Sequence, residues 1–252
     1  EITITDTTFD NNGQTSLRGG AVCMDTDSKL DVTSSTFTSN YANGIATGDG
    51  GGAIYSRGET DVTDSTLSQN SAAKGGALYL AYTGNDITEC DFSENSAENG
   101  GAVYIYAGQT TIDKSGFVDN TASQDASAVY VASGESNTIS NSNFTGVKHV
   151  YTNTGSKTVL NNNKELSTVN SVYAFKNLGT IALNDNVLYN VIINDNGVIE
   201  TETYANVSGN RTYENYDYYF PINATIVDDN NNTIIDYAFQ FTTDHGDVYD
   251  AA

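Results

Sequence analysis

The side chains of this chain that could act as acids, bases or metal ligands are mostly carboxylates. Its 252 residues include 32 Asp and Glu, but only 10 Lys and Arg and 2 His. Glycosidic hydrolysis needs two carboxylates across a cleft, and a lyase needs a basic side chain beside a charge-neutralising cation. The basic residues do not gather with carboxylates in any one repeat, and His149 and His245 are isolated in the sequence. The sequence therefore predicts that the chain is not an enzyme.

Several short runs offer oxygen ligands for calcium. They are 25–27 (DTD), 48–50 (GDG), 184–186 and 194–196 (both NDN), and 227–232 (VDDNNN). None has the Asp spacing of an EF-hand or of the tandem nonapeptide calcium repeat. We therefore interpret these runs as a solvated acidic surface and expect no cofactor, although calcium stays open as a ligand.

The charge of the chain limits its partners. A net charge of −22 and an isoelectric point near 4.1 disfavour nucleic acid and anionic membranes. No run approaches the roughly 18 apolar residues of a membrane span, and the first residues lack a secretory signal pattern. If the chain is exported, we expect its signal and any anchor to lie outside this segment.

One motif recurs along the first part of the chain, with steps of 25 to 30 residues. Its central position is Phe9, Phe37, Leu67, Phe92, Phe117 and Phe144. Five residues earlier stand the β-branched residues Ile4, Val32, Val62, Ile87, Ile112 and Ile139. Two residues earlier stand the small residues Thr7, Ser35, Ser65, Cys90, Ser115 and Ser142, and three residues later stand Asn12, Asn40, Asn70, Asn95 and Asn120.

A second phrase, typified by "GGAVY" at 100–104, follows each Asn after a short polar connection. It supplies an Ala column, namely Ala21, Ala53, Ala77, Ala102 and Ala128. It also supplies a Tyr column of Tyr55, Tyr79, Tyr104 and Tyr130, which we expect to continue as Tyr151 and Tyr173, with Cys23 in its place in the first repeat.

A unit of this length has too few strands to fold alone, so neighbouring units must stack. No LxxLxL run, helical stretch or WD signature supports a leucine-rich repeat or a propeller. We therefore predict an all-β, right-handed parallel β-helix of about 22–25-residue coils over residues 1–205. Each column then becomes a ladder along the axis, with rungs about 4.8 Å apart.

The columns suggest physical roles. We predict that Ala and Tyr, two residues apart, both face the interior together with the Phe and Ile/Val columns. We expect each Asn to lie at a corner, where Asn can tolerate left-handed backbone geometry, and to bond its amide to the next Asn. The Gly pair would permit a tight bend.

The second repeat has the longest connection between its Asn and its Gly pair, residues 41–50 (YANGIATGDG). Insertions in solenoids cluster on one face and often mark a contact surface. The candidate binding residues are therefore Asn43, Thr47 and Asp49.

The alignment also places the remaining reactive side chains. Arg18 and Arg57 fall at strand edges of adjacent coils, where we expect surface salt bridges. Cys23 and Cys90 fall in different columns about three coils apart, which is too far for a disulfide. We expect both to be buried free thiols.

The composition changes after residue 205. Residues 206–252 read as a linker followed by two strands around the turn DDNNN, which favours a partial Ig-like β-sandwich. Five Asn-x-Ser/Thr sequons are candidate glycosylation sites: Asn143, Asn206, Asn210, Asn223 and Asn231.

The FxxN and GGA(I/V)Y motifs resemble the repeats of polymorphic outer-membrane proteins. In its Asn-, Thr- and Tyr-rich style the chain is more similar to adhesin-like surface proteins of gut methanogens, in which an Ig-like module often follows a β-helix. The resemblance implies an extracellular cell-surface protein that attaches to another cell, a protein or a glycan, and its oligomeric state is undetermined. Two other functions stay open, a polysaccharide lyase or hydrolase of the β-helix class and a purely structural wall or stalk component.

Overall fold

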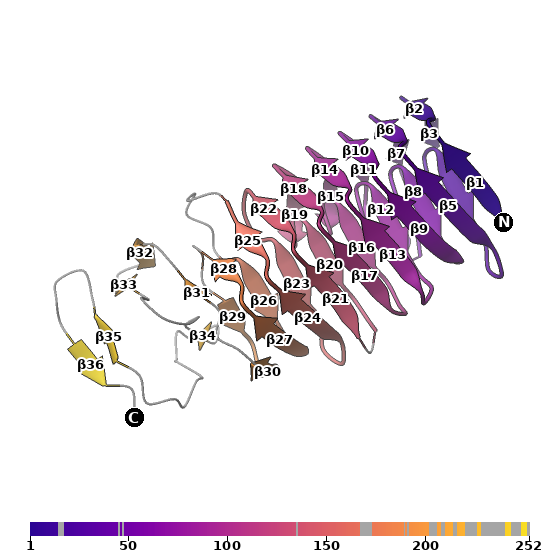
Figure 1. The fold of residues 1–252 in the computed structure, drawn as a ribbon. Coiled ribbons are helices and arrows are strands. Elements are labelled where there is room, and N and C mark those ends of the chain that lie inside the picture. The colour runs from indigo at the N-terminus through magenta and orange to yellow at the C-terminus, as the bar shows by residue number, and fades with distance from the viewer. Residues whose placement is uncertain are drawn as a thin grey trace.

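A computed structural model describes residues 1–14, 18–44, 46, 48–134, 136–166, 173–188, 190 and 192–201, and six short strands after residue 205. All regular elements in this part of the chain are β-strands, and none is a helix. Figure 1 shows them stacked as successive coils from the indigo N-terminus onward. The parallel β-solenoid predicted from the repeats is therefore confirmed.

Three parallel sheets run along the solenoid. Sheet A contains β1 (Ile2–Thr5), β5 (Lys29–Thr33), β9 (Glu59–Thr63), β13 (Asn85–Thr88), β17 (Thr110–Asp113), β21 (Asn137–Ser140), β24 (Lys157–Asn161), β27 (Thr180–Asn184) and β30 (Val198–Thr201). Sheet B contains β2 (Thr8–Asp10), β6 (Thr36–Thr38), β10 (Thr66–Ser68), β14 (Asp91–Ser93), β18 (Gly116–Val118), β22 (Asn143–Thr145), β25 (Lys164–Glu165), β28 (Val187–Leu188) and β31 (Asn206–Val207). Sheet D contains β4 (Val22–Met24), β8 (Ile54–Ser56), β12 (Leu78–Leu80), β16 (Val103–Ile105), β20 (Val129–Val131), β23 (Val150–Thr152), β26 (Phe175–Asn177), β29 (Ile192–Asn194) and β34 (Ile226–Val227).

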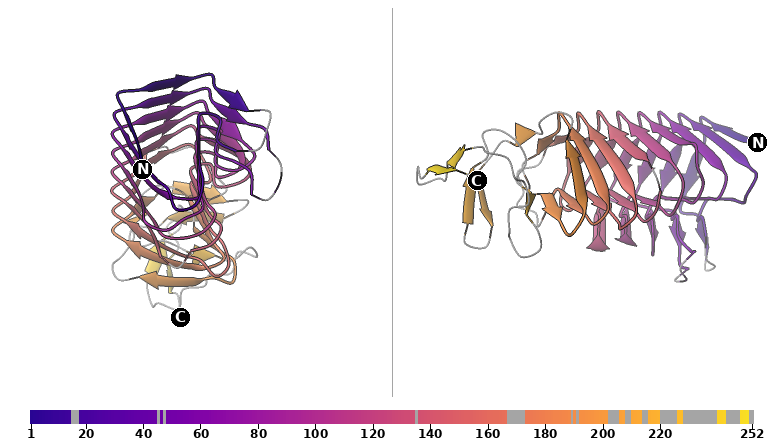
Figure 2. Two further views of the ribbon diagram at one scale, coloured as in Figure 1. Left: turned by 90° about the vertical axis from the view of Figure 1, so that its right-hand side faces the viewer. Right: turned by 90° about the horizontal axis from the view of Figure 1, so that it is seen from below.

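Among the described residues, a shorter parallel sheet, sheet C, lies in the N-terminal coils. It contains β3 (Gly13–Gln14), β7 (Tyr41–Ala42), β11 (Ser71–Ala72), β15 (Ser96–Asn99) and β19 (Thr121–Asp125). Its strands arise from the connections between Asn and Gly-Gly, for which the sequence predicted only polar loops. Figure 2 shows these strands standing out from one side of the solenoid.

The described strands after residue 205 are of two kinds. β31 and β34 pair in parallel with β28 and β29, so they extend sheets B and D past the predicted boundary. The others form a four-stranded antiparallel sheet of β32 (Asn210–Tyr213), β33 (Tyr216–Tyr219), β35 (Gln240–Thr242) and β36 (Val248–Asp250). The Ig-like module predicted for this region stays a prediction.

The Phe and Ile/Val columns stack in register and form the core. Phe37 pairs with Phe9 and Leu67 in sheet B, while Val32 pairs with Ile4 and Val62 in sheet A. From β5 to β22 these side chains are at most 1% exposed. Burying an aliphatic or aromatic side chain contributes about 1.5–3 kcal/mol, so each coil is held mainly by such contacts.

The corners of each coil use left-handed backbone, but not at the ladder Asn. The positive-φ residues lie one position earlier, at Asn11, Ser39, Gln69, Glu94 and Asp119, with φ between 51° and 57°. The ladder Asn therefore does not use the left-handed geometry that Asn can tolerate. The preceding residue turns the chain while its own polar side chain stays at the surface, and the Asn side chain is free to point inward.

The Gly pair has the predicted structural role. Gly75 has a φ of 60°, which only Gly adopts without strain, and in the fifth repeat Ala126 accepts a φ of 58°. A Cβ on the next residue, Gly76, would lie 2.1 Å from the carbonyl oxygen of Gly101 in the following coil. At Gly76 the bend is therefore too close to the following coil for a side chain, whereas the fifth repeat has Ser127 at this position.

The Tyr column does not face the main core, in contrast to the prediction. Ala77 belongs to the main core, whereas Tyr79 belongs to a separate cluster with Tyr55 and Tyr104. Ala77 precedes β12 and lies in the bend, so strand alternation begins only at Leu78, which is also in the core. Tyr151 continues the column, but the next rung is Lys176 rather than Tyr173.

The two cysteines are free, but they differ in exposure. Cys90 is buried in the core, as predicted. Cys23 is exposed, so the prediction that both are buried is wrong. It occupies the first rung of the Tyr column, where sheet D has a neighbouring strand on one side only.

Candidate functional site

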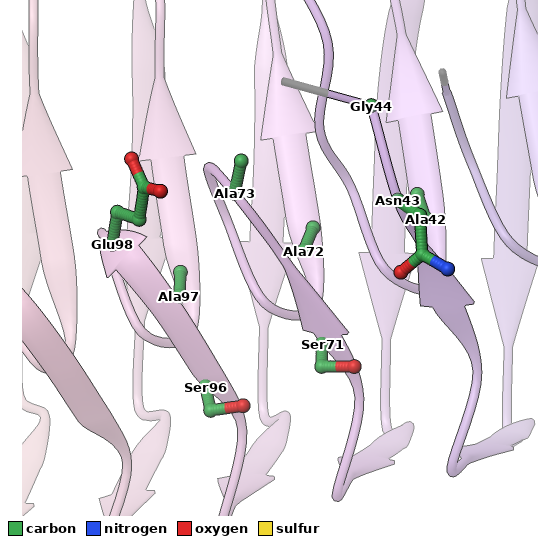
Figure 3. Close-up of a pocket in the computed structure, with 9 residues that line it drawn as sticks. All are labelled: Ala42, Asn43, Gly44, Ser71, Ala72, Ala73, Ser96, Ala97 and Glu98. Atoms are coloured by element: carbon green, nitrogen blue, oxygen red, sulfur yellow. The ribbon is translucent and has the colours of Figure 1, made fainter. Parts of the chain in front are cut away.

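A surface groove crosses sheet C in the described part of the chain. Its volume is about 350 Å³. It is lined by Ala42, Asn43, Gly44, Ser71, Ala72, Ala73, Ser96, Ala97 and Glu98. Figure 3 shows that these residues come from three neighbouring coils, with Asn43 at one end and Glu98 at the other. The small side chains leave room for a ligand, and the two end residues supply polar groups.

The three predicted binding residues have different surroundings. Asn43 is exposed and lines the groove. Thr47 lies outside the described residues. Asp49 is 2% exposed, accepts a hydrogen bond from the Ala46 N–H at 2.9 Å and pairs with Arg18 at 3.4 Å. Its contacts therefore hold the insertion to the preceding coil.

The groove itself was missed by sequence reasoning. Its floor includes Ala42 and the Ser-Ala pairs at the corresponding places of the next two coils, Ser71–Ala72 and Ser96–Ala97. The signal that could have found it is the small pair directly after Asn70, Asn95 and Asn120. Since Ser and Ala are common in polar connections, that signal was not distinctive.

The Asn column forms a continuous hydrogen-bonded ladder. Asn70 donates its backbone N–H to Asn95 Oδ1 at 2.9 Å and its side-chain amide to the same oxygen at 3.0 Å. The same amide also donates to the Phe37 carbonyl at 2.9 Å. Asn40 and Asn95 repeat all three bonds one coil away, Asn12 makes the two inter-Asn bonds, and Asn120 makes the carbonyl bond.

The small-residue column forms a second ladder at the other corner of sheet B. Ser35 donates its backbone N–H to Ser65 Oγ at 3.0 Å, and Ser115 does the same to Ser142 Oγ at 3.2 Å. Toward the C-terminus Asn163 and Asn186 take over this role. The two ladders satisfy buried backbone groups where the strands turn, so they are structural.

The Tyr column is a continuous stack on the outer side of sheet D. Neighbouring ring centroids from Tyr55 to Tyr151 lie 4.5 to 5.3 Å apart, with interplanar angles of at most 18°. Arg18 lies 5.2 Å over Tyr55 at one end of the stack, and Lys176 lies 5.8 Å over Tyr151 at the other. Burial, more than the neighbouring phenols, raises the pKa of Tyr104 to about 12. Burial also raises the pKa of Tyr55, Tyr79 and Tyr130, so these phenols and that of Tyr104 are neutral at physiological pH.

A buried polar cluster interrupts the apolar core near the end of sheet C. Glu165 follows Phe144 in the Phe column, and its side chain is fully buried. Its carboxylate lies 3.1 Å from His149 Nε2 and accepts the Asn190 N–H at 2.7 Å and the Asn190 side-chain amide. Since the cluster is closed to solvent, it has no access for a substrate. The sequence separates these residues by 16 and 25 positions, so His149 looked isolated.

Arg18 and Arg57 are exposed, and each forms an ion pair. Arg57 pairs with Asp25 at 3.1 Å, and Arg18 with Asp49, so the salt bridges expected for both arginines are present. In the described segments no group of three His, Cys, Asp or Glu side chains is arranged to hold a metal ion. The same segments contain no helix with the length and apolarity needed to cross a membrane.

Two stretches of the chain, residues 34–57 and 89–106, match a family model described as the Chlamydia polymorphic membrane protein (Chlamydia_PMP) repeat. Each stretch carries the Phe, Asn and Gly-Gly-Ala-x-Tyr positions of one coil, from Phe37 to Tyr55 and from Phe92 to Tyr104. Neither a curated protein nor a solved structure matches the chain significantly. The chain is therefore a parallel β-solenoid protein with repeats similar to those of polymorphic membrane proteins.

Proposed function

We propose that this chain is a cell-surface adhesin that attaches to another cell, a protein or a glycan through the side of its solenoid. The observation that carries the proposal is the match of two coils to a repeat of polymorphic membrane proteins, together with the rigid, ladder-bonded scaffold. Since each coil contacts only its neighbours, such a scaffold extends a surface over a long distance. The proposal includes the resemblance of the sequence to adhesin-like proteins of gut methanogens.

The groove on sheet C is the first candidate contact surface. It is formed by the strands that stand out from the solenoid, and it includes Asn43 of the longest connection. Among the described residues that line it, Glu98 is the charged one. A ligand with small apolar groups and hydrogen-bonding partners for the serines and for Asn43 would fit this lining.

Several features of the surrounding protein follow from the proposal. The chain would be extracellular and the acidic surface would keep it soluble, with calcium as a candidate ligand. Asn143 is exposed on β22 and is the sequon whose side chain is described. Asn206 and Asn210 lie on β31 and β32, where side chains are not described, and Asn223 and Asn231 lie outside the described residues.

Cell binding by the fluorescently labelled full chain, measured with and without calcium, tests the proposal. We expect saturable attachment to at least one cell type and loss of attachment in Ala72→Tyr, which fills the groove. Thr88→Tyr on the outer side of sheet A is the matched control and should attach like the wild type. Absence of attachment by the wild type would refute the adhesin proposal. Release of new reducing or unsaturated ends from polysaccharides would instead support the enzyme alternative.

A further inference from the structure

The turn that follows sheet D carries a column with one large residue among small ones. Backbone hydrogen bonds place Ala81, Tyr106, Ala132 and Asn153 at the same position of successive coils. Tyr106 is 42% exposed, although it belongs to no sheet and no core cluster. An exposed aromatic side chain between two alanines leaves an open space beside its ring.

The orientation of the Tyr106 ring decides which side is open. It stacks on Tyr79 with a centroid distance of 5.8 Å and an interplanar angle of 21°. Tyr79 lies one coil toward the N-terminus, and it is only 1% exposed. The opposite face of the Tyr106 ring is therefore turned toward the coil of Ala132, where Tyr130 and Ala132 are only partly buried.

The space beside Tyr106, here called the Ala132 step, has defined limits. The register of the coils places it over Ala132, between Tyr106 one rung before and Asn153 one rung after, with Tyr130 two residues before Ala132 in the same coil. The Asn153 side-chain amide donates to the Ala132 carbonyl at 3.1 Å, which fixes its position. Two rungs separate Tyr106 from Asn153, or about 10 Å at the ordinary strand spacing. That distance accommodates one six-membered ring in van der Waals contact with Tyr106.

The chemistry of the Ala132 step selects a neutral ligand. None of its four residues is charged, although the chain has a net charge of −22. Beyond Asn153, the Lys176 ammonium already lies over Tyr151, so a cationic ligand would meet like charge. The net negative charge disfavours acidic glycans. A pyranose ring has an apolar C–H face for the tyrosine and hydroxyl groups for Asn153.

We propose that the Ala132 step binds a neutral pyranose residue of a glycan, whose ring continues the stack in the rung that Ala132 leaves empty. Tyr106 is held in place by Tyr79, so its ring loses little freedom on binding. The proposal rests on the function proposed above, because it names a ligand class and a second contact site for surface attachment.

Saturation-transfer NMR on the full chain tests this site with methyl glycosides of glucose, galactose, mannose and N-acetylglucosamine. We expect transfer to at least one glycoside and at least about tenfold weaker binding in Tyr106→Ala, since aromatic stacking supplies most of the contact. Tyr106→Phe keeps the ring and should bind within about twofold of the wild type. Ala132→Tyr fills the step with a protein ring and should abolish binding.

Tyr82→Ala is the matched control, because Tyr82 is 40% exposed on the turn of a neighbouring coil but does not line the step. It should bind like the wild type, and circular dichroism should show that all variants are folded. No transfer to any neutral glycoside, unchanged binding in Ala132→Tyr, or displacement by choline would overturn the assignment. If cells still attach to Ala132→Tyr, the Ala132 step is not a contact site for attachment, and the adhesin function stands. If the chain binds glycosides but attaches to no cell, the adhesin function is refuted and the glycan site stands.

Discussion

Removing either partner of the buried His149–Glu165 pair should lower the free energy of unfolding of the solenoid. Removing both should lower it by less than the sum of the two single effects. His149 occupies the Ala column, since its carbonyl accepts the Ala128 N–H, and Glu165 occupies the Phe column. Earlier coils place an apolar pair at these two positions. The cluster is therefore a local replacement of core packing by hydrogen bonds.

The magnitude follows from the contacts of the carboxylate. Glu165→Leu leaves the His149 Nε2–H and two N–H groups of Asn190 without their acceptor, while His149→Ala leaves the carboxylate short of one donor. Breaking a buried pair on one side costs about 3–5 kcal/mol of unfolding free energy. The double variant has no orphaned imidazole and no buried carboxylate, so we expect a coupling energy of about 1–3 kcal/mol.

Urea unfolding of the four proteins measures this coupling, followed by far-ultraviolet circular dichroism and by the fluorescence of the 17 Tyr, which no Trp obscures. A control cycle of His149→Ala with the distant Ile112→Val should be additive within about 0.5 kcal/mol. If the His149 and Glu165 variants are additive as well, the two side chains do not stabilise each other, and the reasoning is refuted.

Three further outcomes are expected. Asn70→Ala removes the acceptor of two Asn40 N–H groups and should lower the unfolding free energy by about 3 kcal/mol, measured by urea unfolding. The pKa of Tyr104 is raised from 10.0 to about 12, so its contribution to stability should be intact below pH 10 and fall between pH 10 and 12; ultraviolet absorbance of tyrosinate should rise together with unfolding. A thiol reagent should modify Cys23 in the native protein and reach Cys90, whose pKa burial raises to about 12, only after unfolding.

The register of the solenoid could be predicted because each coil repeats the same column types at nearly constant spacing. Phe37, Phe92 and Phe117 fill the same interior wall, so a shift by one residue would turn them to solvent. The orientation of Tyr79 could not be read from spacing alone. Side chains alternate between the two faces of a strand, so the direction of each one depends on where the strand begins. The sequence does not mark where the bend at Ala77 ends and the strand starts.

The binding surfaces were harder to predict than the scaffold. The connection at residues 41–50 contains Asn43, which lines the groove, but the rest of the groove comes from ordinary coils such as Ser96–Ala97. In the sequence those residues are typical of a polar loop, and their pairing in sheet C is seen only in the structure. The contact of Glu165 with Asn190 lies where Gly-Gly is lost, so no column aligned the two residues.

The ladders also bear on how such a chain can change its length during evolution. The Asn40-to-Asn70 bond is equivalent to the Asn70-to-Asn95 bond, so unequal recombination between two coils would leave every junction with a matching partner. Gene duplication could thus lengthen the reach of the protein by about 4.8 Å per added coil without new contacts having to arise. Recombination across the coil of His149 would separate that residue from Glu165, and selection should act against it.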